Sequence, residues 1–291
     1  SGGAGVQRWL KFSKYLPQYG WEPVILTVDP EYATYPAIDL TLEKELPASL
    51  RVFRTKATDW FRIYSKDKTK IPSAGFAINA DNSFRGKMSR FIRGNFFIPD
   101  PRKGWNRFAF RKACELINNE GISHIITTSP PHSTQLIGLR LKKKFPHITW
   151  VSDLRDTWTD IYYYDLFYPT FPARQLDKNY EQNVLNSCDR ILTVGENLAS
   201  SFGKSIQERD KIVVIPNGYD DNDFRNITVT KSNRFTISYI GTISESYPIN
   251  GFLKALKNIA DPREDFLLRF AGAVPDAVRS RVVSATGASR A

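Results

Sequence analysis

The sequence predicts an α/β protein built from two doubly wound domains with mainly parallel sheets, the second domain being incomplete. Short β-branched runs alternate with stretches of helical periodicity along most of the chain. This alternation breaks at a polar stretch, residues 220–233, and then restarts. Fewer than sixty residues follow the break. That length is too short for a doubly wound domain to close its core.

The first elements are a glycine-rich loop and a helix. Residues 1–5 lead into helical periodicity from Val6 to Leu16, which Gly20 is expected to end. Such a loop attracts phosphate through backbone N–H groups and the helix N-terminus, although glycine can also serve only to allow a tight turn. A strand should precede this loop, so we expect the chain to be a fragment. Strands are predicted at residues 23–28 and 50–54.

A basic and aromatic insertion, about residues 55–105, is expected next. Nine basic residues and one acidic residue lie between Arg85 and Lys112, with seven aromatic residues in or beside this stretch. Basic plus aromatic composition indicates a surface for anionic lipid or, as a weaker alternative, for single-stranded nucleic acid. An ordinary helix with a solvated charged face is the other interpretation.

Regular alternation then resumes in the first domain, residues 1–219, and continues in the second, residues 234–291. We predict helices at residues 106–119, 133–145, 177–186, 196–202, 250–259 and 275–283, and strands at 124–128, 148–153, 190–194, 211–215, 235–240 and 266–270. Ligands of parallel sheets bind beyond the carboxyl ends of the strands. The loops at residues 1–5, 128–130, 153–156 and 195–196 should meet at that edge.

The motif Asp153-Leu154-Arg155-Asp156 is the strongest candidate for chemistry at this edge. Arginine can clamp a phosphate with two hydrogen bonds, and a carboxylate can orient or deprotonate a hydroxyl group. A local ion pair is the structural alternative. The D-x-D pattern at Asp221 and Asp223 lies in the polar stretch and is interpreted as a solvated turn, so no metal site is predicted.

Composition excludes several other classes. No apolar run reaches membrane-spanning length. The two cysteines, Cys114 and Cys188, are far apart, which indicates a reducing compartment and argues against both a disulfide framework and a zinc site. We expect a cytoplasmic protein, peripheral on the inner face of the plasma membrane if the basic stretch meets lipid.

Several motifs together resemble family 4 glycosyltransferases of bacterial surface polysaccharide synthesis. These motifs are the opening SGGAGVQR, KYLP and GWEP, then FIPD with Trp105, DLRDTW, IPNGYD and YIGTI. The resemblance implies a GT-B fold, in which two Rossmann-like domains face each other. It also implies transfer of a sugar from a UDP- or GDP-sugar to a saccharide or lipid-linked acceptor, with retention of configuration and no bound cofactor or metal.

The resemblance also assigns site residues. Gly2 and Gly3 would approach the donor phosphates, and Asp153, Arg155 and Asp156 would stand near the reacting centre. Asn217 and Gly218 would lie in the interdomain segment, and Gly241 and Thr242 on the donor side of the cleft. The family's E-x7-E pair would fall beyond residue 291, so we expect this fragment to be inactive alone. A sugar-nucleotide epimerase and a non-catalytic acceptor- or membrane-binding fragment are the alternative functions.

Overall fold

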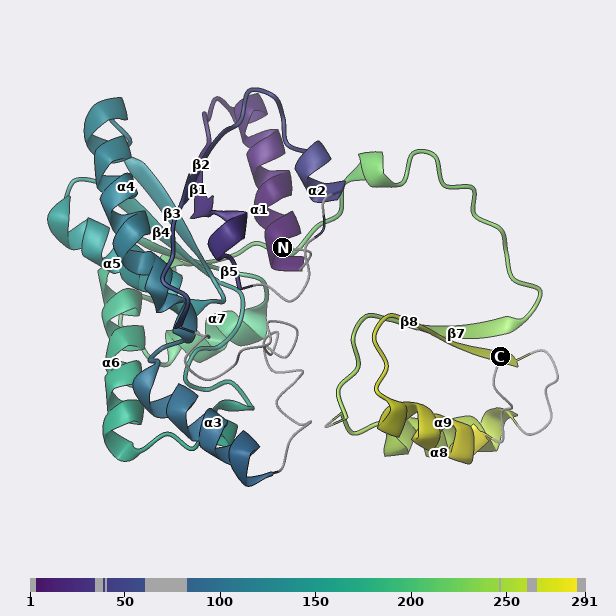
Figure 1. Cartoon of the computed structure of the whole chain (residues 1–291). Helices are drawn as coiled ribbons and strands as arrows, with labels where there is room; N and C mark the ends of the chain where they lie inside the picture. Colours follow the sequence, from purple (N-terminus) through teal and green to yellow (C-terminus); the bar gives the residue numbers. More distant parts are fainter. Residues whose placement is uncertain are drawn as a thin grey trace. The chain divides into compact units, whose positions relative to one another are not determined.

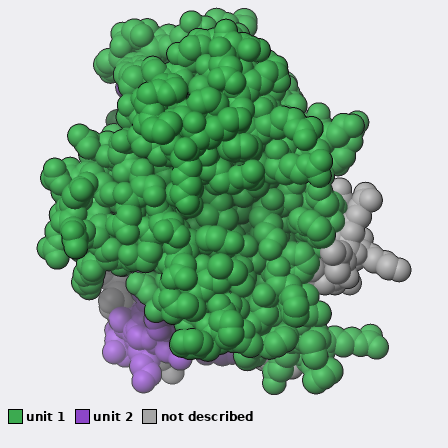
Figure 2. Space-filling model, turned by 90° about the vertical axis from the view of Figure 1, so that its left-hand side faces the viewer, with its two compact units in different colours: residues 1–74, 81–220 green, residues 75–80, 221–291 purple. Residues whose placement is uncertain are grey.

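The chain forms two compact units that are described separately. The computed structural model describes residues 4–34, 39, 41–60, 83–245, 247–260 and 266–286. The described residues of the first unit run from 4 to 220, and those of the second from 221 to 286. Figure 2 shows the two units in different colours on a space-filling view. Predicted features at residues 1–3, 61–82 and 287–291, including Gly2 and Gly3, lie outside the described residues.

The first unit contains six strands and seven α-helices among its described residues (Figure 1). The strands are β1 (Val24–Val28), β2 (Arg51–Thr55), β3 (His124–Ser129), β4 (Thr149–Leu154), β5 (Arg190–Thr193) and β6 (Ile212–Val214). The helices are α1 (Ala4–Tyr15), α2 (Thr41–Lys44), α3 (Phe84–Phe96), α4 (Asn106–Glu120), α5 (Gln135–Lys144), α6 (Phe171–Ser187) and α7 (Glu196–Gly203).

All strand pairs of this unit are parallel. The strands β3, β4, β5 and β6 form one sheet in that order, and β1 pairs with β2 in a second sheet. Thr128 is the register partner of Asp153, which in turn pairs with Leu192. The carboxyl ends of neighbouring strands therefore meet at one edge, as the alternating sequence pattern predicts.

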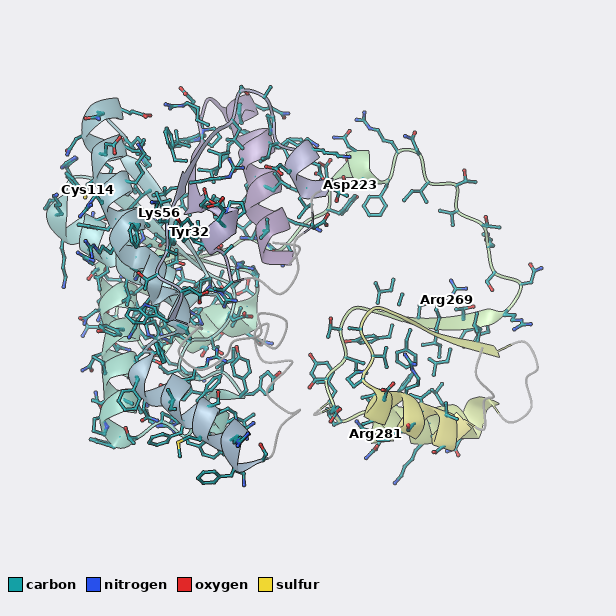
Figure 3. All side chains as sticks on the ribbon, in the orientation of Figure 1. Tyr32, Lys56, Cys114, Asp223, Arg269 and Arg281 are labelled. Carbon is teal, nitrogen blue, oxygen red and sulfur yellow. The ribbon has the colours of Figure 1, made fainter. Side chains whose placement is uncertain are left out.

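The core lies between the four-stranded sheet and the helices α4 to α7. One apolar cluster joins Trp150 and Ile191 of the sheet to Val184 and Leu185 of α6 and Phe202 of α7. A second joins α4 and α5 and includes the buried free Cys114, which is labelled in Figure 3. The helix α1 lies on the other side of the strands from α4, α5 and α6 (Figure 1).

The second unit repeats the β-α-β-α order. Parallel strands β7 (Phe235–Ile240) and β8 (Phe266–Ala271) pair with each other, and α8 (Asn250–Ala260) packs with α9 (Asp276–Thr286). Arg269 on β8 and Arg281 on α9 mark its strand and helix layers in Figure 3. The α/β class with parallel sheets, predicted from the alternation, is confirmed.

Two features of the first unit depart from the predicted elements. The helix α6 begins at Phe171, six residues before the predicted start, and Pro172 occupies its first turn, where proline is tolerated. The basic stretch from Arg85 to Lys112 is two helices, α3 and α4, separated by the short 3-10 helix η5 (Pro101–Trp105). Predicted stops at Gly20 and Gly121 are confirmed, because both adopt the left-handed conformation that glycine favours.

Candidate active site

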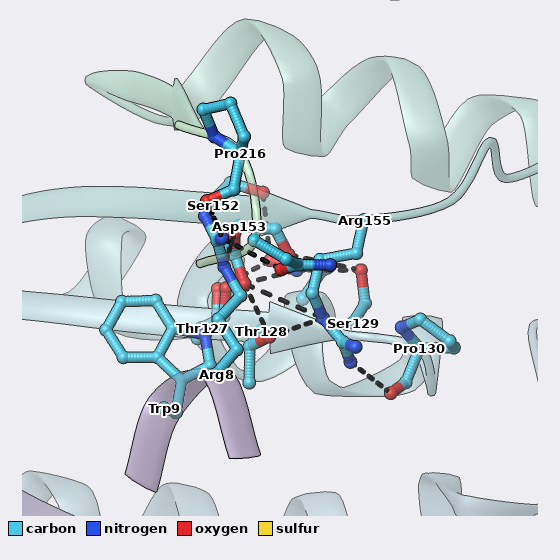
Figure 4. A network of polar contacts seen from close by, with 12 residues as sticks. Arg8, Trp9, Thr127, Thr128, Ser129, Pro130, Ser152, Asp153, Arg155 and Pro216 are labelled. Carbon is cyan, nitrogen blue, oxygen red and sulfur yellow. Dashed lines mark hydrogen bonds and ion pairs between the residues drawn. The ribbon is translucent and has the colours of Figure 1, made fainter. Parts of the chain in front are cut away.

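A fully buried carboxylate, Asp153, is the centre of the polar network at the carboxyl ends of the strands (Figure 4). Its Oδ2 atom accepts hydrogen bonds from Trp9 Nε1 at 2.7 Å and from Thr128 Oγ1 at 2.7 Å. Two arginines flank it: Arg8 Nε lies 3.5 Å from Oδ1, and Arg155 Nε lies 3.8 Å from Oδ2. Burying a charge is costly unless it has partners, and this carboxylate has four.

Arg8 extends from α1 across the ends of the strands. Its Nη1 atom donates to the carbonyl oxygen of Pro216 at 3.2 Å and to Asn217 Oδ1 at 3.0 Å. Its guanidinium also lies over the Phe12 ring, 4.8 Å from the centroid. Its Nη2 atom is buried and has no hydrogen-bond partner among the described residues. Arg8 therefore ties Asp153 to the segment that follows β6, while its Nε and Nη2 atoms form no hydrogen bond with the described residues.

Arg155 occupies the space beside the first turn of α1. Its Nε atom donates to Thr128 Oγ1 at 3.3 Å, and Nη2 donates to the carbonyl oxygen of Pro130 at 3.3 Å. A Cβ atom at Gly5 would overlap this guanidinium, so a larger residue there would displace the end of the Arg155 side chain. Burial lowers the pKa of Arg155, and Asp153 and Asp156 oppose that effect. An arginine remains protonated at neutral pH despite such a shift.

A second layer of hydrogen bonds holds the strand ends in register. The fully buried Gln135, at the start of α5, donates through Nε2 to the carbonyl oxygen of Asp153 at 3.0 Å. Its Oε1 atom accepts from Thr127 Oγ1 at 2.5 Å and from Ser152 Oγ at 2.9 Å. Because one amide bonds to both β3 and β4, it fixes the backbone from which Asp153 and Arg155 project.

Asp156 differs from its neighbour Asp153 in having no hydrogen bond among the described residues. Burial raises its pKa, and Arg155 opposes the shift. Close by in the chain, Trp158 stacks on the His132 ring with centroids 4.8 Å apart. Burial lowers the pKa of His132 to about 4, so this imidazole is neutral at pH 7.

Asp156 forms no hydrogen bond with the described residues, so its carboxylate is still available for a ligand.

A second buried carboxylate, Asp220, binds the opposite end of α1. Its oxygens contact Lys11 Nζ at 3.2 Å, Lys14 Nζ at 2.6 Å and the Tyr15 hydroxyl at 2.6 Å. The hydrogen bond to Asp220 raises the pKa of Lys14. Together with Arg8, these contacts tether residues 216–220 to α1 at two points.

The structure brings together four of the residues proposed from the sequence. Asp153, Arg155 and Asp156 lie at the end of β4, and Asn217 joins them through Arg8. Gly218 follows in an exposed position. Gly241 and Thr242 follow β7 in the second unit, where the Gly241 N–H donates to the Ala271 carbonyl oxygen at 2.9 Å.

Sequence reasoning missed Arg8, Trp9 and Gln135 as members of this network. The helical periodicity from Val6 to Leu16 places Arg8 and Trp9 on a helix, and nothing in the local pattern separates them from ordinary helix residues. The network contains two guanidinium groups for one fully buried carboxylate, beside a helix N-terminus. Such an arrangement favours an anion that carries the remaining negative charge. Among the described residues, no group of three or more potential ligands could hold a metal ion.

Comparisons with known proteins identify the family. A model of Glycosyltransferase Family 4 matches residues 76–223, just over half of the chain. Among solved structures, the chain is similar to S. aureus MnaA in a co-structure with UDP, at 15% identity and a TM-score of 0.39. The match covers 91% of this chain and 66% of that one. No curated protein matches. The α/β architecture with parallel sheets is consistent with a Rossmann-like GT-B fold, and the chain belongs to Glycosyltransferase Family 4.

Proposed function

We propose that the whole protein is a retaining glycosyltransferase that moves a sugar from a UDP- or GDP-sugar to a saccharide or lipid-linked acceptor. Its proposed role is cell-surface polysaccharide synthesis at the cytoplasmic face of the membrane. The observation that carries the proposal is the group of Arg8 and Arg155 around the fully buried Asp153 at the carboxyl ends of parallel strands. The family match supports a glycosyltransferase-type activity.

The charges of this group suit a diphosphate leaving group. Asp153 is shared by the two guanidinium groups, Asp156 also attracts Arg155, and Arg8 Nε and Nη2 are buried without a hydrogen-bond partner among the described residues. The first turn of α1 adds backbone N–H groups to the same region. Arginine donors that are already fixed in position stabilise negative charge as it develops on the leaving group.

We assign different tasks to the two aspartates. The Oδ2 atom of Asp153 accepts from Trp9 and Thr128, and its Oδ1 faces Arg8, so its task is to position the arginines. Asp156 has no such partners in the described part of the chain, and burial raises its pKa. Its proposed task is to orient the acceptor hydroxyl and take up its proton. Gly2, Gly3, Gly218, Gly241 and Thr242 are proposed contacts of the donor.

The test is transfer of labelled sugar from UDP- and GDP-sugars by the whole protein and its Arg155→Ala and Arg155→Lys variants. Loss of one preorganised donor costs about 10²–10³ in turnover, so Arg155→Ala should be at least this impaired and Arg155→Lys less so. Arg140→Ala, an exposed change on α5, is the matched control. Near-normal transfer by Arg155→Ala would refute the role of Arg155. An altered sugar-nucleotide formed without any acceptor would instead favour the epimerase.

A further inference from the structure

The helix α3 presents an apolar stripe to solvent. Phe84, Met88 and Phe91 recur at spacings of four and three residues, and their exposed fractions are 77%, 44% and 37%. No residue of α3 is buried. Residues at this spacing share one face of a helix, which in a globular protein normally packs against the core. The described part of the chain leaves this face uncovered.

The last turn of α3 is fixed to the rest of the first unit. Asn95 Nδ2 donates to the Tyr168 carbonyl oxygen at 3.1 Å, and Asn95 Oδ1 accepts from the Thr170 N–H at 2.8 Å. The Arg93 guanidinium lies 4.0 Å from the centroid of the Phe167 ring, in the 3-10 helix η7 (Tyr164–Phe167). The apolar stripe is therefore displayed on a docked helix.

An open apolar groove of about 340 Å³ runs between α3 and the start of α6. Phe91, Phe96 and Ile98 line one side, and Pro172, Ala173 and Leu176 line the other. The exposed fraction of Phe96 is 68%, and that of the neighbouring Phe171 is 80%. The stripe and groove together form a continuous apolar surface, which exceeds the isolated apolar residues that are normal on a soluble protein.

The charge on this surface is one-sided. The helix α3 carries four basic residues, Arg85, Lys87, Arg90 and Arg93, and no acidic residue. Arg85 and Lys87 are exposed and form no ion pair with the described residues. On α4, Lys112 is in a different environment, because it pairs with Glu115 at 2.6 Å and lies over the Phe53 ring. The structure thus divides the basic stretch of the sequence and leaves the apolar–basic surface to α3.

From this surface we infer that α3, η7 and the start of α6 bind an anionic lipid bilayer. Phe84, Met88 and Phe91 enter the acyl boundary, Arg85 and Lys87 meet the lipid headgroups, and the groove holds an acyl chain. Aromatic residues flanked by basic residues on one helix face are the combination that interfacial helices use. None of the described helices is long and apolar enough to cross a membrane. The inference extends the proposed function, because a lipid-linked acceptor would lie at such a surface.

Vesicle sedimentation tests the surface without any transfer reaction, so its failure and the failure of the proposed function are distinguishable. Wild-type chain should sediment with vesicles of phosphatidylcholine and phosphatidylglycerol at about 0.1 M salt and be largely released at about 1 M salt. Phosphatidylcholine vesicles alone should bind at least about tenfold less. Absence of sedimentation with anionic vesicles at low salt overturns the inference.

Two variants separate the apolar and the charged contributions. Replacing Phe84, Met88 and Phe91 by serine should weaken binding to anionic vesicles about tenfold or more, because all three side chains leave the acyl boundary. Arg85→Glu with Lys87→Glu should weaken it by a similar factor or more. The control is Arg140→Glu with Lys143→Glu, which makes the same change in net charge on exposed positions of α5. Equal losses in both double variants, or no loss in the serine variant, would overturn the assignment to α3.

Two further measurements keep the result specific. The tryptophan emission of each variant should match wild type, which shows that the first unit is still folded. Size-exclusion chromatography and binding of a labelled single-stranded oligonucleotide test other occupants of the same surface. If vesicles do not bind, the lipid assignment is overturned, and these two measurements then identify the occupant. A dimer that the serine variant abolishes indicates a second copy of the chain, and oligonucleotide binding that the glutamate variant abolishes indicates a nucleic acid.

Discussion

Replacing Asp153 with asparagine removes the charge that pairs with the buried Arg8 and the partly buried Arg155, and changes little else. The side chain is fully buried and its exposed fraction is 0%. Asparagine has nearly the same shape and keeps one oxygen that can accept from Trp9 or Thr128. Breaking a buried ion pair by removing one partner costs about 3–5 kcal/mol. Because one hydrogen-bond acceptor survives, we expect the lower end, about 3 kcal/mol, for Asp153→Asn.

Tryptophan fluorescence during urea unfolding measures this effect in the first unit alone. All six tryptophans lie at or before Trp158, so none reports on the second unit. A loss of about 3 kcal/mol moves the urea midpoint down by about 1 M or more. The matched control is Asp156→Asn, three residues along the same segment, whose carboxylate has no hydrogen bond among the described residues. Its expected effect is below about 1 kcal/mol.

The urea midpoints of the two variants test whether the two arginines depend on Asp153. Similar midpoints for Asp153→Asn and Asp156→Asn would mean that the buried arginines do not depend on Asp153. A midpoint for Asp153→Asn near that of wild type would have the same meaning. Either result would remove the physical basis for assigning Asp153 a positioning task.

Three other predictions follow from buried contacts of the first unit. Burial raises the pKa of Asp177 to about 6, so the folded state keeps a proton that the unfolded chain releases near pH 4. The contribution of protonated Asp177 to the stability of the folded state is fully present below pH 4 and is lost as the pH rises through 6. Between pH 4 and pH 7 the free energy of unfolding of wild type should therefore fall by about 3 kcal/mol relative to that of Asp177→Asn. Unfolding free energies that change in parallel with pH in the two proteins would contradict this. Gly5→Ala should destabilise the first unit by about 1–3 kcal/mol in urea by displacing Arg155, whereas Gly195→Ala, with open space around its Cβ position, should change little. Asp220→Asn should lower the urea midpoint of the first unit, because it removes the buried charged partner of Lys11 and Lys14, and the exposed Asp221→Asn should leave the midpoint unchanged; equal midpoints in both variants would contradict the tether to α1.

Much of the fold follows from the local sequence pattern, because glycine and proline residues mark where several strands and helices end. The strand β3 ends before Pro130 and Pro131, and α4 ends at Gly121, which takes the left-handed conformation. The start of α6 was predicted too late, because Phe171 and Pro172 carry no helical periodicity of their own. Their helical conformation follows from the proline at the first turn and from the first helical hydrogen bond, which the Arg174 N–H donates to the Thr170 carbonyl oxygen at 2.9 Å.

The candidate site could be located from the sequence but not assembled from it. Parallel strands bring their carboxyl ends together, so the position of Asp153 and Arg155 followed from topology alone. The partners that give these residues their electrostatic state come from elsewhere: Arg8 and Trp9 lie more than 140 positions away, on a helix whose own periodicity explains them equally well as surface or core. Only the crossing of α1 over the strand ends turns Arg8 into a second guanidinium for one carboxylate. A single sequence records that charge but not its neighbour, and for that reason the proposal that the site binds an anion depends on the tertiary structure.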